Sequence, residues 1–434
     1  MTVTITNLGS SGPTGVAIND NGQIAGDAML TSGADDAFLW RDGTISDLGR
    51  LSGDSDSAAN GINNQGQVVG VSSTVPMGGA GSYHAVIWQN GTPTALTSLQ
   101  ELSAAYAINN LGQVVGVHGL ANGATEAFFW QNGTPTDLGW LPGVTSQSFT
   151  SVSAADDIND AGQIVGKSWT AQGDTHAVLW QNGTITDLGG LASSYNGRAK
   201  AINAKGQIVG DSSFSSDSYD THAVLWQNGT ITDLGTLSGD DISAATAIDN
   251  AGDIVGWAGL RAGSGVDHAV MWQNGKIVDL NSLLPADSGW VLSDATGIND
   301  LGQIVGAGTY NGVDAAFVLY LDGSTPVITS AAQSLIQSFQ AGATAALADT
   351  AADIAAHLDG LQAVAVAGKL SITLTDSGSS TPRLVVTPAQ LVADASAINA
   401  ITTPHTLSVA GVSSAVATFT VQQDASGRGS GGIN

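Results

Sequence analysis

The chain has 434 residues and carries 11 basic against 37 acidic side chains, which gives a formal net charge of −26. An acidic surface of this strength repels phosphate backbones and anionic lipid, so we expect no nucleic-acid partner and no binding to a membrane surface. The sequence contains no apolar run of about 20 residues, which argues against membrane insertion, and no cysteine, which excludes disulfides and thiolate metal sites.

One sequence unit recurs seven times before about residue 325. Its first half is an isoleucine followed by [ND]-x-x-G-x-[IV]-x-G, and its second half is clearest at residues 222–235, His-Ala-Val-Leu-Trp-Gln-Asn-Gly-Thr-Ile-Thr-Asp-Leu-Gly. The isoleucine anchors are Ile18, Ile62, Ile108, Ile158, Ile202, Ile248 and Ile298. Repeats of 44 to 50 residues are typical of four-stranded propeller blades.

Each unit supplies four short strands. In the fifth copy the Asn and Gly of residues 203–207 predict a tight hairpin between the first two strands, because these residue types tolerate positive φ. A variable polar loop leads to the third strand, whose bulky and small side chains alternate. Asn228-Gly229 then predicts a second hairpin into the fourth strand.

The ends of the repeat region predict closure into a ring. Residues 2–9 match a fourth strand that has no first three strands before it, and the seventh unit departs from the pattern after Gly323. We therefore expect an all-β seven-bladed β-propeller in which the N-terminal strand completes the last blade and removes its free edge. The expected blades are 13–49, 57–97, 103–139, 153–189, 197–235, 243–281 and 293–323.

The connections divide into two kinds. The two hairpins of each blade are short and nearly invariant, and they lie on one rim because alternate turns of a meander share a side. The loops between the second and third strands, such as 211–221, and those between blades, such as 140–152, vary in sequence and form the opposite rim. We call this the variable rim and expect a binding function to lie there.

The repeats resemble the HAF-type extracellular repeats of bacteria, which are named for His-Ala-Phe in the third strand. The matching residues are Ala37-Phe38, His84-Ala85-Val86, Ala127-Phe128, His176-Ala177, His222-Ala223 and His268-Ala269, whereas the first, third and seventh copies lack the His. The resemblance covers about three quarters of the chain. It implies secretion or surface display rather than a particular reaction.

The location of the protein has two interpretations. The N-terminus has no basic leader and no apolar signal core, so the protein is expected either to be cytoplasmic or to use an uncleaved C-terminal export signal. An acidic chain poor in Lys and rich in Gly, Ala, Ser and Thr resembles clients of bacterial type I secretion. We favour an extracellular or cell-surface location, although the Gly-rich calcium-binding nonapeptides of many such clients are absent.

The composition changes after Pro326, which predicts a second domain. Residues 326–425 are expected to form a small α+β module, with helices over 330–366 and 388–401, a hairpin between strands at 370–375 and 383–387, and a strand over 406–421. The module resembles those repeated in large bacterial secreted and surface proteins. Residues 426–434 are expected to be a flexible tail or linker.

Two residue types recur in the third strands. The tryptophans are Trp40, Trp88, Trp130, Trp180, Trp226 and Trp272. A large aromatic ring at one position of nearly every blade favours packing between blades over ligand stacking. The histidines His84, His176, His222 and His268 lie too far from the axis to meet at one metal, so we expect them to bond to backbone or to acidic side chains.

Residues that break the repeat are the candidates for function. The tryptophans outside the ring pattern could grip a glycan or peptide, or fill the loops. Variable residues on the innermost strands could face solvent in the channel, meet a ligand at its mouth, or pair their charges. The ligand-binding candidates are Trp140, Trp169, Trp257, Trp290, Tyr106, Asp156, Asp157, Arg198 and Lys200.

Acidic clusters with glycine suit calcium by their oxygen ligands, but none matches a spaced calcium loop, and a solvated loop is the alternative. The candidates are Asp54, Asp56, Asp240 and Asp241. No other cofactor and no catalytic motif is predicted. The sequence favours a non-enzymatic, adhesin-like scaffold whose variable rim engages a glycan, a surface protein or another copy of the chain; the alternative is a hydrolase or lyase at the channel mouth.

Overall fold

The computed structural model describes residues 3–9, 17–29, 35–41, 44–76, 79, 81–96, 99, 102–144, 152–192, 196–215, 220–261 and 267–321, together with six short strands beyond residue 344. The contacts divide the chain into two compact units, Met1–Ser324 and Thr325–Asn434, which are described separately.

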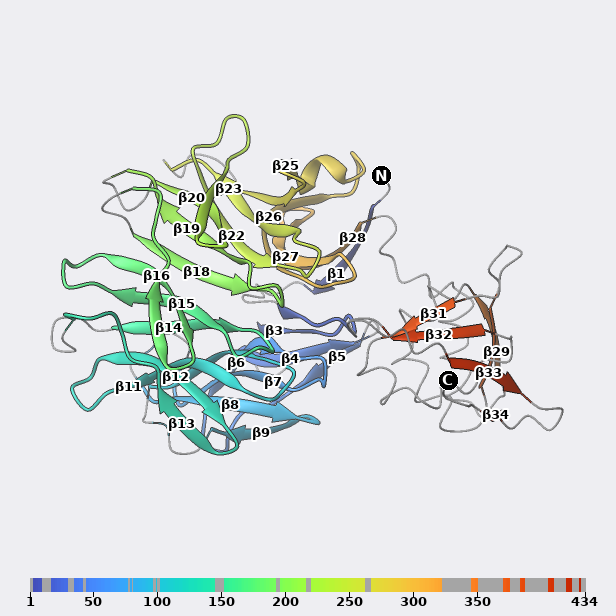
Figure 1. Cartoon of the computed structure of the whole chain (residues 1–434), viewed down its shortest axis with the longest axis horizontal. Coiled ribbons are helices and arrows are strands. Elements are labelled where there is room, and N and C mark those ends of the chain that lie inside the picture. The colour runs from blue at the N-terminus through green and yellow to red at the C-terminus, as the bar shows by residue number, and fades with distance from the viewer. Residues whose placement is uncertain are drawn as a thin grey trace. The chain divides into compact units, whose positions relative to one another are not determined.

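The first unit is a β-propeller of seven four-stranded antiparallel sheets, which confirms the predicted fold class (Figure 1). Blades one to three are β2 (Ala17–Ile18), β3 (Ile24–Met29), β4 (Asp35–Arg41), β5 (Thr44–Asp47); β6 (Asp56–Ile62), β7 (Val68–Ser73), β8 (Tyr83–Gln89), β9 (Thr92–Ala95); and β10 (Ala104–Ile108), β11 (Val114–Gly119), β12 (Thr125–Gln131), β13 (Thr134–Asp137). Blades four to six are β14 (Ser153–Ile158), β15 (Ile164–Trp169), β16 (Thr175–Gln181), β17 (Thr184–Asp187); β18 (Gly197–Ile202), β19 (Ile208–Ser213), β20 (Thr221–Gln227), β21 (Thr230–Gly235); and β22 (Ile242–Ile248), β23 (Ile254–Gly259), β24 (His268–Gln273), β25 (Lys276–Asp279). A 3-10 helix, η1 (Leu280–Leu283), capped by the Asp279 side chain, leads to blade seven.

Blade seven is completed by the N-terminal strand, as predicted. It consists of β26 (Trp290–Ile298), β27 (Gln303–Tyr310), β28 (Val313–Leu321) and β1 (Val3–Gly9), in the sheet order β26-β27-β28-β1 reading outward. The antiparallel register runs from Val3 opposite Leu321 to Asn7 opposite Phe317. The side chain of Leu8 is buried in the cluster that contains Val305 and Val318. The N-terminal strand β1 therefore joins the two ends of the propeller by backbone pairing and by packing.

Blade seven also differs from the others at the variable rim. Its first strand begins at Trp290, three residues earlier than expected. Its second and third strands meet at a two-residue hairpin, Asn311-Gly312, with φ of 51° and 78°, in place of a longer loop. Because both turn residues have positive φ, this hairpin has the geometry that matches strand twist. The blade therefore continues as paired strands up to the variable rim, with an additional register shift between Leu292 and Asp294.

A β-bulge recurs in the inner strands. In blades two to seven the register shifts at the residue two before the anchoring isoleucine, as between Ala155 and Asp157 in blade four. The shift brings the next strand very close, since a Cβ added to Gly166 would lie 2.0 Å from the carbonyl oxygen of Ala154. This contact explains the glycine of every Ile-Val-Gly segment. The bulge leaves one residue per blade unpaired and re-aims its side chain.

The core lies between adjacent blades. Each third-strand tryptophan packs against residues of the preceding blade, as Trp180 does against Val115 and Ala127 and Trp226 does against Val165 and Ala177. The indole N–H groups of Trp88, Trp226 and Trp272 donate to backbone carbonyls of the preceding blade at 3.0 Å. The predicted packing role of these rings is confirmed.

In the second unit the described residues are β29 (Ala345–Asp349), β30 (Leu370–Leu374), β31 (Arg383–Val386), β32 (His405–Val409), β33 (Phe419–Gln423) and β34 (Gly429–Ser430). The expected hairpin between β30 and β31 is wrong, since β30 pairs in parallel with β29 and β31 pairs in parallel with β32. β29 also lies within a segment predicted as helix, because pairing with β30 overrides the helix preference of alanine. The other residues of the two expected helices lie outside the described part of the chain. No helix among the described residues is long and apolar enough to cross a membrane.

Candidate functional site

The first hairpins of the seven blades meet around the axis and form a ring of hydrogen bonds. In blades one to five and seven, the asparagine after the anchoring isoleucine donates its Nδ2 to the backbone carbonyl of the aligned residue in the next blade, at 2.8 to 3.1 Å. The last of these bonds runs from Asn299 to Asn19 across the closure of the propeller. We call these residues the turn ring; they are Asn19, Asn63, Asn109, Asn159, Asn203, Asp249 and Asn299.

The residues that follow the turn ring form a second circle. The backbone N–H of each of these residues except Asp160 donates to a side-chain oxygen of the next blade, as when Asp300 donates to Asp20 Oδ1 at 3.0 Å and Asn250 donates to Asp300 Oδ1 at 2.8 Å. The circle is interrupted at Asp160, because the next blade carries Ala204, which has no side-chain acceptor. The two circles surround a hollow of about 210 Å³ whose lining includes Asp20, Asp160, Asp249 and Asp300 and no basic side chain. Burial, together with the charge of Asp300, raises the pKa of Asp20 above its ordinary value.

The turn ring has one gap, and filling it should stabilise the protein. The side chain of Asp249 has no N–H to donate to the next blade, and burial raises the pKa of its carboxyl. We expect Asp249→Asn to add the missing bond to the Asn299 carbonyl and to increase the free energy of unfolding by about 1 kcal/mol, the usual net contribution of one hydrogen bond. Urea denaturation at pH 7 measures the change, and a decrease in stability would contradict this account of the ring.

The charged candidates on the inner strands are paired with one another. Arg198 on β18 binds both carboxylate oxygens of Asp156 on β14, with an Nε to Oδ2 distance of 2.5 Å. The Lys200 Nζ lies 3.2 Å from Asp211 Oδ1 within blade five. Burial, and next the charge of Asp156, raises the pKa of the Tyr106 phenol. The structure thus brings Tyr106, Asp156, Arg198 and Lys200 into one region of blades three to five, where they support the predicted charge pairing.

Asp157 stands at a position that is Ala or Gly in the other six blades. Its two carboxylate oxygens accept the backbone N–H groups of Ile158 and of Ile202 in the next blade, both at 2.8 Å. Desolvation outweighs these bonds and raises the pKa of the carboxyl from 3.8 to about 6. The residue therefore joins blades four and five and holds a proton unusually tightly.

This carboxyl should make stability depend on pH. Because folded Asp157 binds its proton more tightly than the unfolded chain does, its contribution to the free energy of unfolding falls as pH rises from about 4 to 6. Two pKa units correspond to roughly 3 kcal/mol. We expect Asp157→Ala to remove this part of the pH dependence, measured by denaturation at pH 4 and pH 7, whereas Asp314→Ala at an exposed position should not. Parallel profiles for all three proteins would contradict the expectation.

The four tryptophans outside the repeat pattern are less exposed than their expected role requires. Trp290 is only 9% exposed and packs against Tyr310 and Phe317, with ring centroids 5.1 and 6.1 Å apart, so it belongs to the core. Trp140, Trp169 and Trp257 are partly buried, and Trp140 donates its indole N–H to the Val144 carbonyl at 3.0 Å. These contacts favour the alternative role of filling the loops.

The calcium candidates are occupied by protein groups. Asp54 accepts the hydroxyl of Ser72 at 2.6 Å and lies 3.1 Å from His84 Nδ1, while Asp240 lies 3.1 Å from His268 Nδ1. Asp241 accepts the backbone N–H of Arg261, and Asp56 is 5% exposed. The structure does not bring the four carboxylates together. The predicted pairing of the repeat histidines with acidic side chains is confirmed by these two contacts and, in blades four and five, by His176 with Asp187 and His222 with Asp233.

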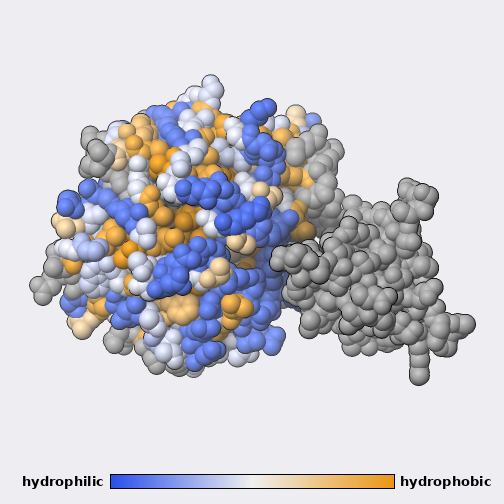
Figure 2. Space-filling view, viewed as in Figure 1, coloured by the Kyte–Doolittle hydropathy of each residue, from blue (hydrophilic) through white to orange (hydrophobic). Residues whose placement is uncertain are grey.

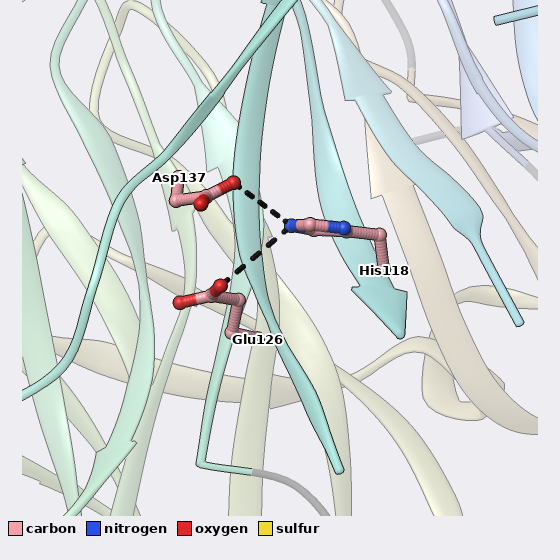
Figure 3. Close-up of side chains that lie close together, drawn as sticks. All are labelled: His118, Glu126 and Asp137. Carbon is pink, nitrogen blue, oxygen red and sulfur yellow. Dashed lines mark hydrogen bonds and ion pairs between the residues drawn. The ribbon is translucent and has the colours of Figure 1, made fainter. Parts of the chain in front are cut away.

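One group of potential metal ligands lies elsewhere, on blade three (Figure 3). His118, Glu126 and Asp137 come from the adjacent strands β11, β12 and β13, and their ligand atoms lie within 4.8 Å of one another. His118 Nε2 is 3.1 Å from Asp137 Oδ1 and 3.9 Å from Glu126 Oε1. Burial, and next the charge of Asp137, raises the pKa of Glu126 from 4.5 to about 7. This group was not predicted from the sequence, although alignment of the blades shows His118 where the other blades have Ser, Ala or Gly.

No protein-family model matches the sequence, and no curated protein matches it. Solved structures with similar folds include TolB from Acinetobacter baumannii, at 12% identity over 50% of this chain and 51% of that chain with a TM-score of 0.36. They also include an acylaminoacyl peptidase of Pyrococcus horikoshii, at 11% identity over 78% and 60% with a TM-score of 0.43, and a sialidase of Trypanosoma rangeli, at 12% over 76% and 58% with a TM-score of 0.37. The chain spans between half and three fifths of the length of these proteins. The resemblance to HAF-type repeats is thus not supported by a family model.

Proposed function

We propose that the chain is a non-enzymatic binding scaffold whose variable rim engages a glycan, a surface protein or a second copy of the chain. The observation that carries this proposal is the distribution of exposed apolar side chains. Among the described residues eight large apolar side chains are exposed, and six of them lie on the variable rim. These six are Leu102, Phe214, Leu260, Val291, Tyr310 and Val313.

Three of the six lie on blade seven. Tyr310 and Val313 flank the Asn311-Gly312 hairpin and are paired across it, whereas Val291 on the neighbouring strand β26 is paired with Thr309 and so points to the other face of the sheet. They are 37%, 57% and 43% exposed. Behind them, Trp290 supports the Tyr310 ring at a centroid distance of 5.1 Å. A supported aromatic ring beside the apolar side chain of Val313 suits the C–H face of a sugar or an apolar side chain of a partner.

The surface in view in Figure 2 is mixed, with hydrophilic residues in blue among apolar residues in orange. Charged side chains that could serve catalysis on the inner strands are instead engaged in ion pairs and backbone contacts, as Asp156 is by Arg198. These contacts support a scaffold rather than an enzyme.

We further propose, on composition, that the protein acts outside the cell or at its surface, where calcium at the acidic loops would be an additional ligand.

A hydrolase or lyase at the channel mouth is the second candidate, and the raised pKa of Asp157 is the observation that favours it. Asp156, Asp157 and Lys200 would carry such a reaction. An enzyme of this kind would lose turnover in Asp157→Ala while remaining folded. A scaffold would keep its binding unchanged in the same variant, because the residue contacts only backbone within the propeller.

The proposal is tested first by asking whether the protein binds at all. A glycan array and an array of surface proteins are probed with the full chain, with and without calcium, and with the Trp169→Ala, Trp257→Ala double variant. Selective binding supports the scaffold, and its loss in the double variant would place the site beside these rings. Light scattering that grows with protein concentration would indicate a second copy as the partner. A folded protein that binds nothing and stays monomeric would count against the proposal.

A further inference from the structure

Blade three carries a buried carboxylate that lacks the cation found in blade one. Asp36 and Glu126 occupy the same position of the third strand and are 1% and 4% exposed. In blade one the guanidinium of Arg50 lies 3.2 Å from Asp36 Oδ2. The residue aligned with Arg50 in blade three is Trp140, which brings no charge. Because an unpaired buried carboxylate is costly, this carboxyl must either hold a proton or have another positive partner.

Blade three also differs from other blades in the pair of residues that face each other across its second and third strands. Blades two, four and five place a serine opposite the repeat histidine, as Ser168 is opposite His176. In blade three these two positions are His118 and Glu126, so the imidazole has moved one strand inward and a carboxylate has taken its place. Asp137, on the next strand, is the counterpart of Asp187 and Asp233 in blades four and five. The change thus adds one carboxylate to the His and Asp that those blades already hold.

The Glu126 carboxylate accepts no hydrogen bond from the described residues. It is directed at the His118 imidazole, but the 3.9 Å separation of Oε1 and Nε2 is too long for a hydrogen bond (Figure 3). His118 is itself 8% exposed, and its Nδ1 has no partner among the described atoms. Two buried polar side chains therefore face one another with only Asp137, which is 63% exposed, to complete the group.

We propose that His118, Glu126 and Asp137 bind one divalent first-row transition-metal ion of the Zn²⁺ type. One imidazole and two carboxylates form a nitrogen and oxygen ligand set that suits such ions, whereas Ca²⁺ and Mg²⁺ prefer oxygen alone. In a tetrahedral site with bonds of about 2.1 Å, ligand atoms are about 3.4 Å apart, and the observed separations from Nε2, 3.1 and 3.9 Å, bracket this value. The exposure of Asp137 provides an entry path and leaves a position for water or a ligand.

The competing explanation is that a protonated His118 is itself the cation between the two carboxylates. The two accounts differ in what Nε2 carries at neutral pH. If the metal is bound, Nε2 is a ligand and has no proton, whereas the competing explanation requires a proton on both ring nitrogens. Nitrogen-15 NMR of the imidazole in the presence of Zn²⁺ distinguishes these states.

The test uses the untagged full chain, stripped with a chelator and dialysed against micromolar Zn²⁺. We expect the wild type to hold one more zinc per chain than the double variant His118→Ser, Glu126→His. This variant gives blade three the serine and histidine that blades four and five have at these positions, so we expect it to fold like the wild type. We expect Glu126→Gln to bind more than about 100-fold more weakly, because loss of even an outer-shell partner costs 10- to 100-fold. When Co²⁺ replaces Zn²⁺, the spectrum of the wild type should show a nitrogen ligand, and the spectrum of the double variant should not.

Equal zinc content in the wild type and the folded double variant would overturn the proposal, and so would a doubly protonated His118 with Zn²⁺ in excess. If the double variant fails to fold, Glu126→Gln and the NMR measurement decide the question in the same way. Tight binding of Ca²⁺ but not of Zn²⁺ would also contradict the assignment of the metal class.

Discussion

Replacing Trp180 by alanine should lower the free energy of unfolding by about 3–5 kcal/mol, the range for a large aromatic side chain removed from a core. Trp180 is 3% exposed and packs against Val115 and Ala127 of the preceding blade. Its indole N–H has no hydrogen-bond partner among the described residues, so the loss reflects packing between blades. Urea denaturation measures the change.

Trp169→Ala is the matched comparison, since this residue lies in the same blade but outside the inter-blade cluster. It is partly buried at the end of β15, and we expect its loss to be mild, below about 1.5 kcal/mol. Equal losses for the two variants would show that the repeated tryptophans have no special role in joining blades.

The second large effect is expected in the turn ring. Asn159 is 6% exposed and makes four hydrogen bonds: Nδ2 to the Asn203 carbonyl and to Gln163 Oε1, and Oδ1 from the N–H groups of Ala161 and Gln163. Asn159→Ala leaves several of these buried partners unsatisfied. With 0.5–1.5 kcal/mol for each bond, we expect a loss of roughly 3–5 kcal/mol.

The control for this variant is Asn21→Ala, on the same rim of the propeller. Asn21 is exposed, and its side chain donates one bond, to the Asn64 carbonyl at 2.8 Å. We expect a loss below about 1 kcal/mol. If both variants melt at the wild-type temperature, the asparagines act only as turn formers and the ring of bonds contributes nothing to closure.

The sequence was sufficient for the blades because each carries its own signals. Asn228-Gly229 predicts a hairpin on local grounds, and its φ angles of 52° and 73° confirm it. The closure of blade seven by the N-terminal strand could be predicted by counting strands, since residues 2–9 match a fourth strand that has no first three strands before it. In the second unit the local signals failed, because β29 and β31 take partners distant in sequence that no local pattern specifies.

The contacts between blades could be predicted only in part. Asn203 was interpreted as a turn residue, and its bond to the Asp249 carbonyl could not be foreseen, because it depends on the ends of neighbouring blades meeting at the axis. Asp157 and His118 could have been identified as unusual by aligning the repeats, because the other blades have only small residues at each of these two positions. The partner of Asp157 still required the closed ring, since this residue reaches the backbone of the next blade, whereas the neighbours of His118 lie in its own blade.

We propose that the variable rim is the binding face of the propeller. It is tested most directly by measuring the affinity of a partner identified on the arrays for three proteins: wild type, the double variant Tyr310→Ser, Val313→Thr on the variable rim, and Leu111→Ser. Leu111 is 62% exposed in the first hairpin of blade three, on the opposite rim, and serves as the control. We predict that the double variant binds at least about 10-fold more weakly, which is 1.4 kcal/mol, and that Leu111→Ser binds like the wild type. Loss of affinity in Leu111→Ser with full affinity in the double variant would contradict the claim and place the site at the turn ring.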